Sequence, residues 1–434
     1  MEPPNKKTRS NGELTLSLSR NSPDLSTLPD NVLIHILSFM DPKEAVQTCI
    51  LSKRWRNLWT CVPSLNFDKS GFEGSHAAFV HFVTNMLLFR GASKLDTFRL
   101  RWHACEKVST LGQENCQIHV SNASAWIFSA LRCKPLTISL DLYGFANLEL
   151  PHALFTCSSL EHLDLQFFES RRAATEPSYV NLPNLKKLKL RCFQLSDPVM
   201  EMILSGCPLL EELSLDSCSL NFSCMKSDLL RCLAIINCRG SGLVEFFLPN
   251  LVSLSLKNEY PGKTKLSLKN TPSLVKVSVF YHHFVECYFS GAEFEFFNYL
   301  TTVTDLELYG SGVKELLEKT VPNCPIFSNL KQLTFGQWSI NEKLDLLCQM
   351  LQHTPNLEKL TIVHKKDITY VPKKHARSGE VKEKCATGQI PFRCEHLKVI
   401  DIRYSDPSGA HELVGILLQN ISQGERVRID LSRF

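Results

Sequence analysis

The sequence predicts an α/β protein in which a small N-terminal unit of three helices precedes an irregular solenoid of repeats built on a parallel sheet. Apolar residues recur at three- and four-residue spacing between residues 24 and 67, as in amphipathic helices. From residue 157 onward the pattern L-x-x-L-x-L returns. The distance in sequence from one copy to the next falls within or at the edge of about 20 to 29 residues, except before the last copy. This period is typical of stacked repeats. A chain of 434 residues can hold one short module and an elongated array.

Residues 24–67 are predicted to form a helical unit with apolar surface to spare. The first helix is expected to open at Leu28 and Pro29, because proline fits a first helical turn, where its missing N–H costs nothing. Asp41 followed by Pro42 is typical of a cap and the start of a second helix, and a third short helix follows. The residues expected to form the apolar stripes are Val32, Leu33, Ile36, Leu37, Met40, Ala45, Val46, Cys49, Ile50, Leu51, Trp55, Leu58 and Trp59. About forty-five residues barely enclose a core alone, so the surplus apolar surface implies a partner.

This segment resembles an F-box in its landmarks Leu28-Pro29, Leu33/Ile36/Leu37, Val46, Leu51-Ser52, Arg54-Trp55-Arg56, Leu58-Trp59 and Pro63-Ser64-Leu65. The resemblance implies docking on a Skp-type adaptor, which joins a cullin and a RING protein in a ubiquitin ligase. The residues assigned to adaptor binding are Leu28, Pro29, Leu33, Ile36, Leu37, Val46, Leu51, Ser52, Trp55 and Leu58. The alternative is that these residues pack only against one another and against the next domain.

Residues 68–150 are expected to link this unit to the regular repeats. An amphipathic helix is predicted at residues 76–90 from the spacing of Phe79, Phe82, Val83, Met86 and Leu87. Two irregular repeats are expected, one at residues 93–102 and one where Ile138, Leu140 and Leu142 alternate.

Residues 151–364 are predicted to be leucine-rich repeats. In each copy the x-L-x-L-x core is expected to be a short strand with inward leucines, and stacked copies share one parallel sheet. Cys218 and Cys238 occupy the Asn/Cys position of the repeat template, which favours a structural role over a reactive one. The order of F-box, linking helix and repeats resembles the plant F-box/leucine-rich-repeat family over nearly all of the chain.

The C-terminal part is predicted to contain a basic surface loop at residues 365–390, followed by the last repeat and a C-terminal cap at 391–434. Between residues 365 and 384, seven Lys or Arg side chains face three acids. After the last repeat, Asp406-Pro407 is expected to start a helix. The apolar residues of that helix and of a closing strand are Leu413, Val414, Ile416, Leu417, Leu418, Val427, Ile429 and Leu431. This ending resembles the FBD-type tail of the same family and would cap the open end of the array.

Composition argues against several classes of protein. The net charge of +4 is too small to imply a nucleic-acid partner. Residues 1–23 are expected to be a disordered polar tail without the apolar core of a signal peptide, and no later run approaches a membrane span, so we expect an intracellular protein of the nucleus and/or cytoplasm. Lys6, Lys7 and Arg9 could serve nuclear import or simply be solvated. The seventeen cysteines are odd in number and are expected to be free thiols.

Residue patterns for catalysis or cofactor binding are missing from the sequence. It has no metal-binding Cys-x-x-Cys pair, Gly-rich phosphate loop, G-x-S-x-G elbow or H-E-x-x-H helix. Cys385, Cys394 and His396 near His364 lack the spacing of a zinc site. We therefore expect no metal, no cofactor and no catalytic residue.

The resemblance implies a non-catalytic substrate-recognition subunit of an SCF-type (Skp–cullin–F-box) E3 ubiquitin ligase, in which the F-box binds the adaptor and the repeats bind an unidentified target protein. One alternative is an interaction scaffold that binds an adaptor outside a ligase. Another is a small-molecule sensor, although the strongly basic floor of such receptors is missing from this sequence.

The target site is predicted from strand alternation, because residues that flank inward leucines must point to the solvent side of the sheet. The outward residues of six successive copies are His162, Asp164 and Gln166; Lys187, Lys189 and Arg191; Glu212, Ser214 and Asp216; Cys232, Ala234 and Ile236; Ser253, Ser255 and Lys257; and Lys276, Ser278 and Phe280. The basic row is expected to be partly neutralised by the acids beside it, which allows a self-paired solvated face as the alternative. The apolar row beside them predicts a target contact at Ile236, with Lys257 and Phe280 further along, and the basic loop is the other candidate.

Overall fold

The protein is described by a computed structural model that divides into two compact units, Met1–Val62 and Pro63–Phe434. The described residues are 25–91, 93–103, 113–143, 150–168, 178–240, 242–257, 265–280, 297–310, 313–338, 344–364, 396–405, 414–415, 417 and 427–433. The predicted polar tail and basic loop, and most of the predicted C-terminal helix, lie outside these residues.

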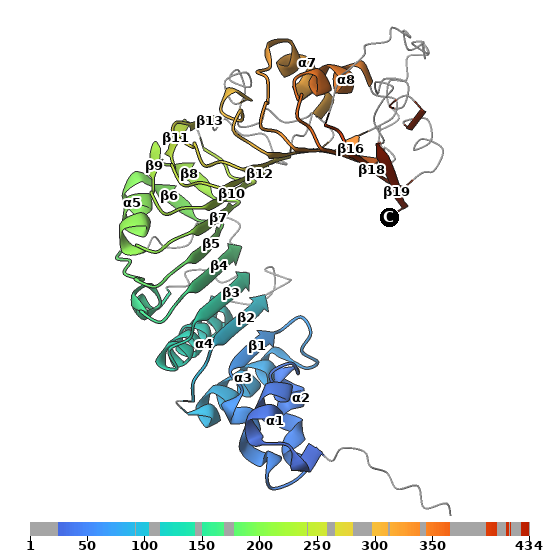
Figure 1. Ribbon diagram of the computed structural model, residues 1–434. Coiled ribbons are helices and arrows are strands. Elements are labelled where there is room, and N and C mark those ends of the chain that lie inside the picture. The colour runs from blue at the N-terminus through green and yellow to red at the C-terminus, as the bar shows by residue number, and fades with distance from the viewer. Residues whose placement is uncertain are drawn as a thin grey trace, which may run out of the picture. The chain divides into compact units, whose positions relative to one another are not determined.

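The first unit contains the expected helices in short form (Figure 1). Its elements are η1 (Leu25–Thr27), α1 (Asp30–Leu37), α2 (Pro42–Gln47), η2 (Thr48–Ile50) and η3 (Trp55–Cys61). The Asp41 carboxylate caps α2 by accepting a hydrogen bond of 2.8 Å from the N–H of Lys43, as predicted. The third helix is a 3₁₀ segment that begins only at Trp55, so Leu51 lies before it rather than within it.

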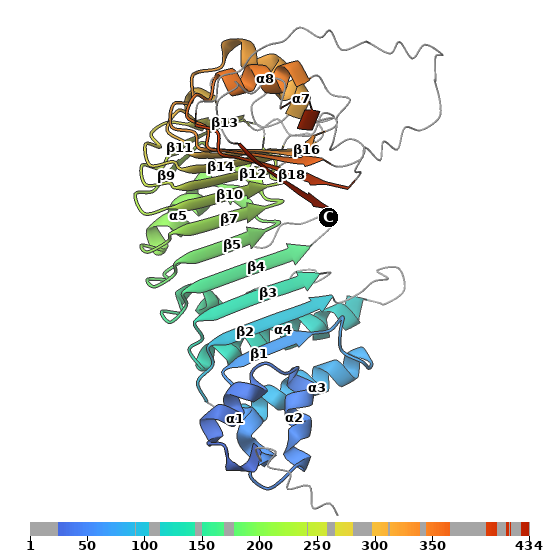
Figure 2. The same ribbon diagram turned by 45° about the vertical axis from the view of Figure 1, so that its right-hand side comes forward.

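The second unit is built on one parallel sheet of fourteen strands among the described residues (Figure 2). In spatial order these are β1 (Ser64–Asp68), β2 (Thr97–His103), β3 (Thr137–Tyr143), β4 (His162–Phe168), β5 (Lys187–Arg191), β7 (Glu212–Asp216), β10 (Cys232–Ile236), β12 (Ser253–Lys257), β14 (Lys276–Phe280), β15 (Asp305–Tyr309), β16 (Gln332–Trp338), β17 (Lys359–His364), β18 (Val399–Tyr404) and β19 (Arg428–Arg433). The two irregular repeats expected near residues 93–102 and 138–142 are therefore present as β2 and β3, and the closing strand is present as β19.

Two small parallel sheets accompany the main one. One pairs β6 (Gln194–Ser196) with β8 (Ser219–Asn221), and the other has the order β13 (Lys265–Leu268), β11 (Leu243–Phe247) and β9 (Cys224–Lys226). They follow the main strands of their repeats along the chain. The connections of these repeats thus contain short extended segments, and the one that contains β6 continues into helix α5 (Asp197–Gly206).

Alternation within each strand separates a buried face from an open one. In β7, for example, Leu213 and Leu215 are buried while Glu212, Ser214 and Asp216 are half-exposed. From β5 to β10 the strands pair without an offset from one copy to the next, so equivalent residues form rows across the sheet. The repeat interpretation is confirmed by this topology.

The turn after the strand repeats from copy to copy. Cys192, Ser217 and Asn237 hold the same position and all adopt positive φ angles, of 62°, 53° and 50°. One residue later, the Cys218 thiol donates to the carbonyl of Leu190 at 3.4 Å, and the Cys238 thiol donates to that of Leu215 at 3.3 Å. Both cysteines are buried, and these bonds tie each turn to the preceding copy. This placement supports the structural role predicted for both cysteines.

Helices cover one face of the sheet and leave the outward rows on the other (Figures 1 and 2). The helices are α3 (His76–Arg90), α4 (Gln113–Arg132), α5 (Asp197–Gly206), α7 (Val313–Thr320) and α8 (Leu344–Gln352), with 3₁₀ segments η4 (His152–Thr156) and η5 (Val321–Asn323). Buried Phe79, Val83 and Met86 confirm the predicted helix at 76–90.

Aromatic side chains join α3 and α4 to the sheet. The rings of Trp102 and Trp126 stack with centroids 4.9 Å apart, and Phe79 contacts both edge-on. The indole N–H of Trp126 also donates to the Thr84 hydroxyl at 3.0 Å. Helix α4 was not predicted from the sequence, although Trp126 lies within it.

Gly206 is a position where the packing of α5 leaves no room for a side chain. A Cβ there would lie 2.3 Å from the carbonyl oxygen of Val180, whose neighbour Leu182 donates its N–H to the Gly206 carbonyl at 2.8 Å. We expect Gly206→Ala to lower the free energy of unfolding by about 1 to 3 kcal/mol, as for other overpacked sites. Denaturant unfolding measures this loss. Gly71→Ala, where an added Cβ meets nothing within 4 Å, is the control and should leave stability nearly unchanged.

Candidate functional site

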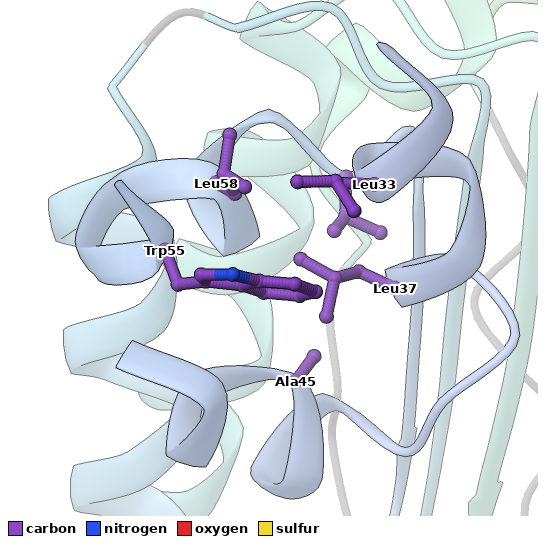
Figure 3. Close-up of a cluster of buried hydrophobic side chains, with 6 residues drawn as sticks. Leu33, Leu37, Ala45, Trp55 and Leu58 are labelled. Atoms are coloured by element: carbon purple, nitrogen blue, oxygen red, sulfur yellow. The ribbon is translucent and has the colours of Figure 1, made fainter. Parts of the chain in front are cut away.

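The first unit encloses its own core, which is shown in Figure 3. The core consists of Leu33, Leu37, Ala45, Trp55, Leu58 and Val62, all buried. In Figure 3 the indole of Trp55 extends toward Leu37 and Ala45. Leu28 and Trp59 pack against this cluster from its border.

The residues predicted to bind an adaptor therefore divide into two groups. Leu33, Leu37, Trp55 and Leu58 belong to the core, and Leu28 and Val46 are half-buried. Pro29, Ile36, Leu51 and Ser52 are exposed. A partner that docks on this unit meets the second group directly, while the core residues act by supporting the surface.

Exposed apolar side chains are concentrated on the first unit in what we call the N-terminal apolar surface, made of Val32, Ile36, Phe39, Ile50 and Leu51. Val32, Ile36 and Phe39 follow one another at helical spacing along and just beyond α1. Ile50 is 83% exposed, Phe39 78% and Leu51 62%. The sequence analysis missed Phe39 and placed Ile50 only in a helix stripe, because spacing alone does not show which apolar residues the core leaves out.

Arg54 links the segment before η3 to the N-terminal end of α1. Its guanidinium donates to the Asp30 carboxylate at 2.7 Å and to the carbonyl of Leu28. These bonds link the segment before η3 to the start of α1, and so hold Leu28 and Pro29 in place. The pair is largely exposed, so its role is mainly to fix geometry.

On the outward face of the sheet, the basic side chains of β5 form ion pairs with acidic side chains of β4 and β7. Lys187 lies 2.9 Å from Glu212, Arg191 lies 3.3 Å from Asp216, and Lys189 lies 3.9 Å from Asp164. The strand register places these partners side by side. The predicted partial neutralisation of the basic row is confirmed.

Neighbouring strands continue this pairing. The Arg101 guanidinium lies between Asp68 at 3.2 Å and Asp141 at 3.1 Å. Burial alone would raise the pKa of Asp68, but the hydrogen bonds from Ser70 and the charge of Arg101 together lower it. Further along, the hydrogen bond to Glu307, at 2.6 Å, raises the pKa of Lys276. These rows are thus occupied by internal ion pairs.

Two hollows lie on the outward face. One has a volume of about 330 Å³ and spans β3 to β12, with Lys189, Ser214, Cys232, Ala234 and Ser255 among its lining residues. The other has a volume of about 400 Å³ and extends over β1 to β4, with Arg99 and Arg101 in its lining. The first hollow therefore includes two residues of the predicted apolar row, but it does not include Ile236.

The three residues predicted to contact a target are brought together. Ile236 pairs in register with Lys257, and Lys257 pairs with Phe280, on β10, β12 and β14. The Lys257 ammonium lies 5.3 Å from the centroid of the Phe280 ring. All three side chains are half-buried. They form a continuous strip on the outward face.

Potential metal ligands are not clustered in the part of the chain that the structure describes, and burial raises the pKa of several of its thiols. No cluster of three or more His, Cys, Asp or Glu that could hold a metal ion occurs there. Burial raises the pKa of the Cys192 thiol to about 11 and those of Cys207 and Cys324 to about 12, which disfavours the nucleophilic thiolate. Cys385 and Cys394 lie outside the described residues. No helix among the described residues is long and apolar enough to cross a membrane.

A compact helical module with exposed apolar side chains, followed by a parallel repeat sheet, defines the class of F-box proteins with leucine-rich repeats. The F-box domain family matches residues 25–66. A second family, described as FBD-associated F-box protein At5g56370, LRR repeats, matches residues 136–289. The two matches cover the module and the middle of the sheet.

Relatives from Arabidopsis thaliana share most of this chain. The putative FBD-associated F-box protein At5g56440 is 32% identical over 77% of this chain and 74% of its own length. F-box/FBD/LRR-repeat protein At4g26340 is 31% identical over 79% of this chain and 77% of its own length. The match to putative F-box/LRR-repeat protein At3g42770, at 29% identity, spans 64% of that protein. The chain belongs to the family of F-box/FBD/LRR-repeat proteins, which are typically substrate adaptors of SCF ligases and generally non-catalytic.

Proposed function

We propose that this chain is the substrate-recognition subunit of an SCF-type E3 ubiquitin ligase. The observation that carries the proposal is the N-terminal apolar surface on a module of the F-box family. Exposed aromatic and aliphatic side chains on one small module are suited to docking on an apolar groove of a partner. A Skp-type adaptor is that partner, and through it the chain joins a cullin and a RING protein.

The repeats hold the protein target in this proposal. The outward face of the sheet offers two hollows and the strip of Ile236, Lys257 and Phe280, whereas its other rows are largely occupied by internal ion pairs. No catalytic group of the chain takes part, since ubiquitin transfer is performed by the other subunits. This role places the protein in the nucleus and/or cytoplasm.

Reconstitution tests the ligase role. The purified chain is mixed with adaptor, cullin, RING protein, ubiquitin and a conjugating enzyme, and we expect it to enter one complex with the cullin. Leu28→Ala/Pro29→Ala should lose the adaptor, because it removes the Leu28 side chain at the border of the core and the exposed Pro29 ring, while the repeat sheet stays folded. Leu209→Ala, at an exposed leucine of the second unit, is the control.

The composition of the complex decides between the proposals. A chain that binds adaptor but never recruits cullin would be a scaffold outside a ligase. Undiminished adaptor binding by the double variant would contradict the assignment of Leu28 and Pro29 to adaptor binding.

A further inference from the structure

Four equivalent positions on neighbouring strands of the outward face are mostly apolar or aromatic, in contrast to the ion-paired positions earlier in the sheet. They are occupied by Ile236, Lys257, Phe280 and Tyr309, which pair in register on β10, β12, β14 and β15. At the corresponding position earlier in the sheet, Arg191 and Asp216 form an ion pair. Here only Lys257 carries a charge, and its ammonium lies over the Phe280 ring. We call these four residues the aromatic row.

Gly336 makes room for the ring of Tyr309, the last residue of the aromatic row. It follows on β16, and a Cβ built on it would lie 1.9 Å from Cδ1 of Tyr309 and 2.6 Å from Cε1. The Tyr309 ring therefore lies directly over the backbone of β16, in the space that any other residue would fill. The strand register shifts between Gly336 and Trp338, immediately beyond the ring. Glycine at this position lets the tyrosine lie across the sheet.

The chemistry of the row selects its ligand. The half-buried rings of Phe280 and Tyr309 offer apolar faces to a side chain that packs on them. Burial, followed by the nearby Glu307 carboxylate, raises the pKa of Tyr309, so its hydroxyl keeps its proton and can donate. Among the four residues of the row only Lys257 carries a formal charge, and that charge is positive. An apolar group next to an anionic group matches these features.

We propose that the aromatic row anchors a short segment of the target protein that presents an apolar side chain next to an aspartate or glutamate. The apolar side chain packs on Phe280 and Tyr309, and the carboxylate pairs with Lys257. This inference rests on the proposed function, in which the repeats hold the target. It adds the chemical class of the segment that is recognised and a positioning role for Gly336.

A displayed library of short random peptides, selected on the purified full chain, is the test. We expect enrichment of peptides in which an apolar residue neighbours Asp or Glu. Synthetic copies of the enriched peptides should bind at least about tenfold more weakly to Phe280→Ala, and similarly to Gly336→Ala, in which the added methyl displaces Tyr309. Lys257→Glu should reverse the preference toward Lys or Arg beside the apolar residue.

Matched variants separate this site from general effects. Lys359→Glu makes the same charge reversal on β17 of the same sheet, and Gly71→Ala adds a methyl where nothing lies within 4 Å. Both should bind the enriched peptides like the wild type. Tyr309→Leu removes the ring and adds no atom near the backbone of β16. It should also weaken peptide binding, so it tests the row even if Gly336→Ala fails to fold.

Three results would overturn the inference: no enrichment over a Phe280→Ala/Tyr309→Ala variant, no acidic preference on the wild type, or an unchanged preference on Lys257→Glu. The selection uses neither cullin nor ubiquitin. A chain that binds these peptides but never enters a cullin complex would refute the ligase role alone. A chain that enters the complex without this preference would refute the aromatic row alone.

Discussion

Replacing Ile50 and Leu51 together with glutamate is expected to abolish co-purification of the Skp-type adaptor while the first unit stays folded. Both side chains are largely exposed and lie outside the core of that unit, so the change places charges on the proposed docking surface and removes little internal packing. Buried anchors at interfaces contribute about 2 kcal/mol or more each, so the two together should weaken binding by about a thousandfold. Titration of purified adaptor onto the full chain measures this change.

Exposed leucines of the second unit provide the control for that experiment. Leu88 is 71% exposed on α3, and Leu229 is also exposed. Leu88→Glu and Leu229→Glu introduce the same charge and should leave adaptor affinity unchanged. Equal loss of binding in these controls would mean that charge or general misfolding, rather than the N-terminal apolar surface, causes the effect.

The sheet could be predicted from the sequence because the alternation of inward and outward residues can be read within each short strand. A strand period of two fixes which residues face outward, so the pairing of Lys187 with Glu212 and the adjacency of Ile236, Lys257 and Phe280 follow from aligning the copies. Tyr309 was outside that reasoning, which stopped at Phe280. Its position also depends on Gly336, which has no side chain to occupy the space of the ring. The alternation of residues within one strand does not predict such a contact between two strands.

The helical parts were harder to predict, since a helix stripe does not show what covers it. Leu37 and Ile36 are neighbours in one amphipathic pattern, yet the first is in the core and the second is exposed. The sequence therefore identified the module but did not separate its buried residues from its exposed ones. Helix α4 was missed because its apolar residues gather near its C-terminal end, around Trp126, instead of recurring along its length.

The separation of core from docking surface makes a different prediction for Trp55. Its indole fills the centre of the small core, and replacing a buried tryptophan by alanine typically costs about 3 to 5 kcal/mol. A unit this small has little stability in reserve. We expect Trp55→Ala to unfold the first unit and leave the repeat sheet intact, with loss of hydrogen-exchange protection in residues 25–62 but not in residues of β3 to β12.

Trp59 is the matched control, because it only borders the same core and donates its indole N–H to the Arg56 carbonyl at 3.0 Å. Trp59→Ala should retain most of the protection. Adaptor added to Trp55→Ala should restore part of it, since a ligand at a hundred times its Kd stabilises the bound form by about 2.7 kcal/mol. The Ile50→Glu/Leu51→Glu variant should show the opposite behaviour, with normal protection and no gain from adaptor. Normal protection in Trp55→Ala would show that the core does not support the docking surface, and the division of the F-box residues into two groups would then be wrong.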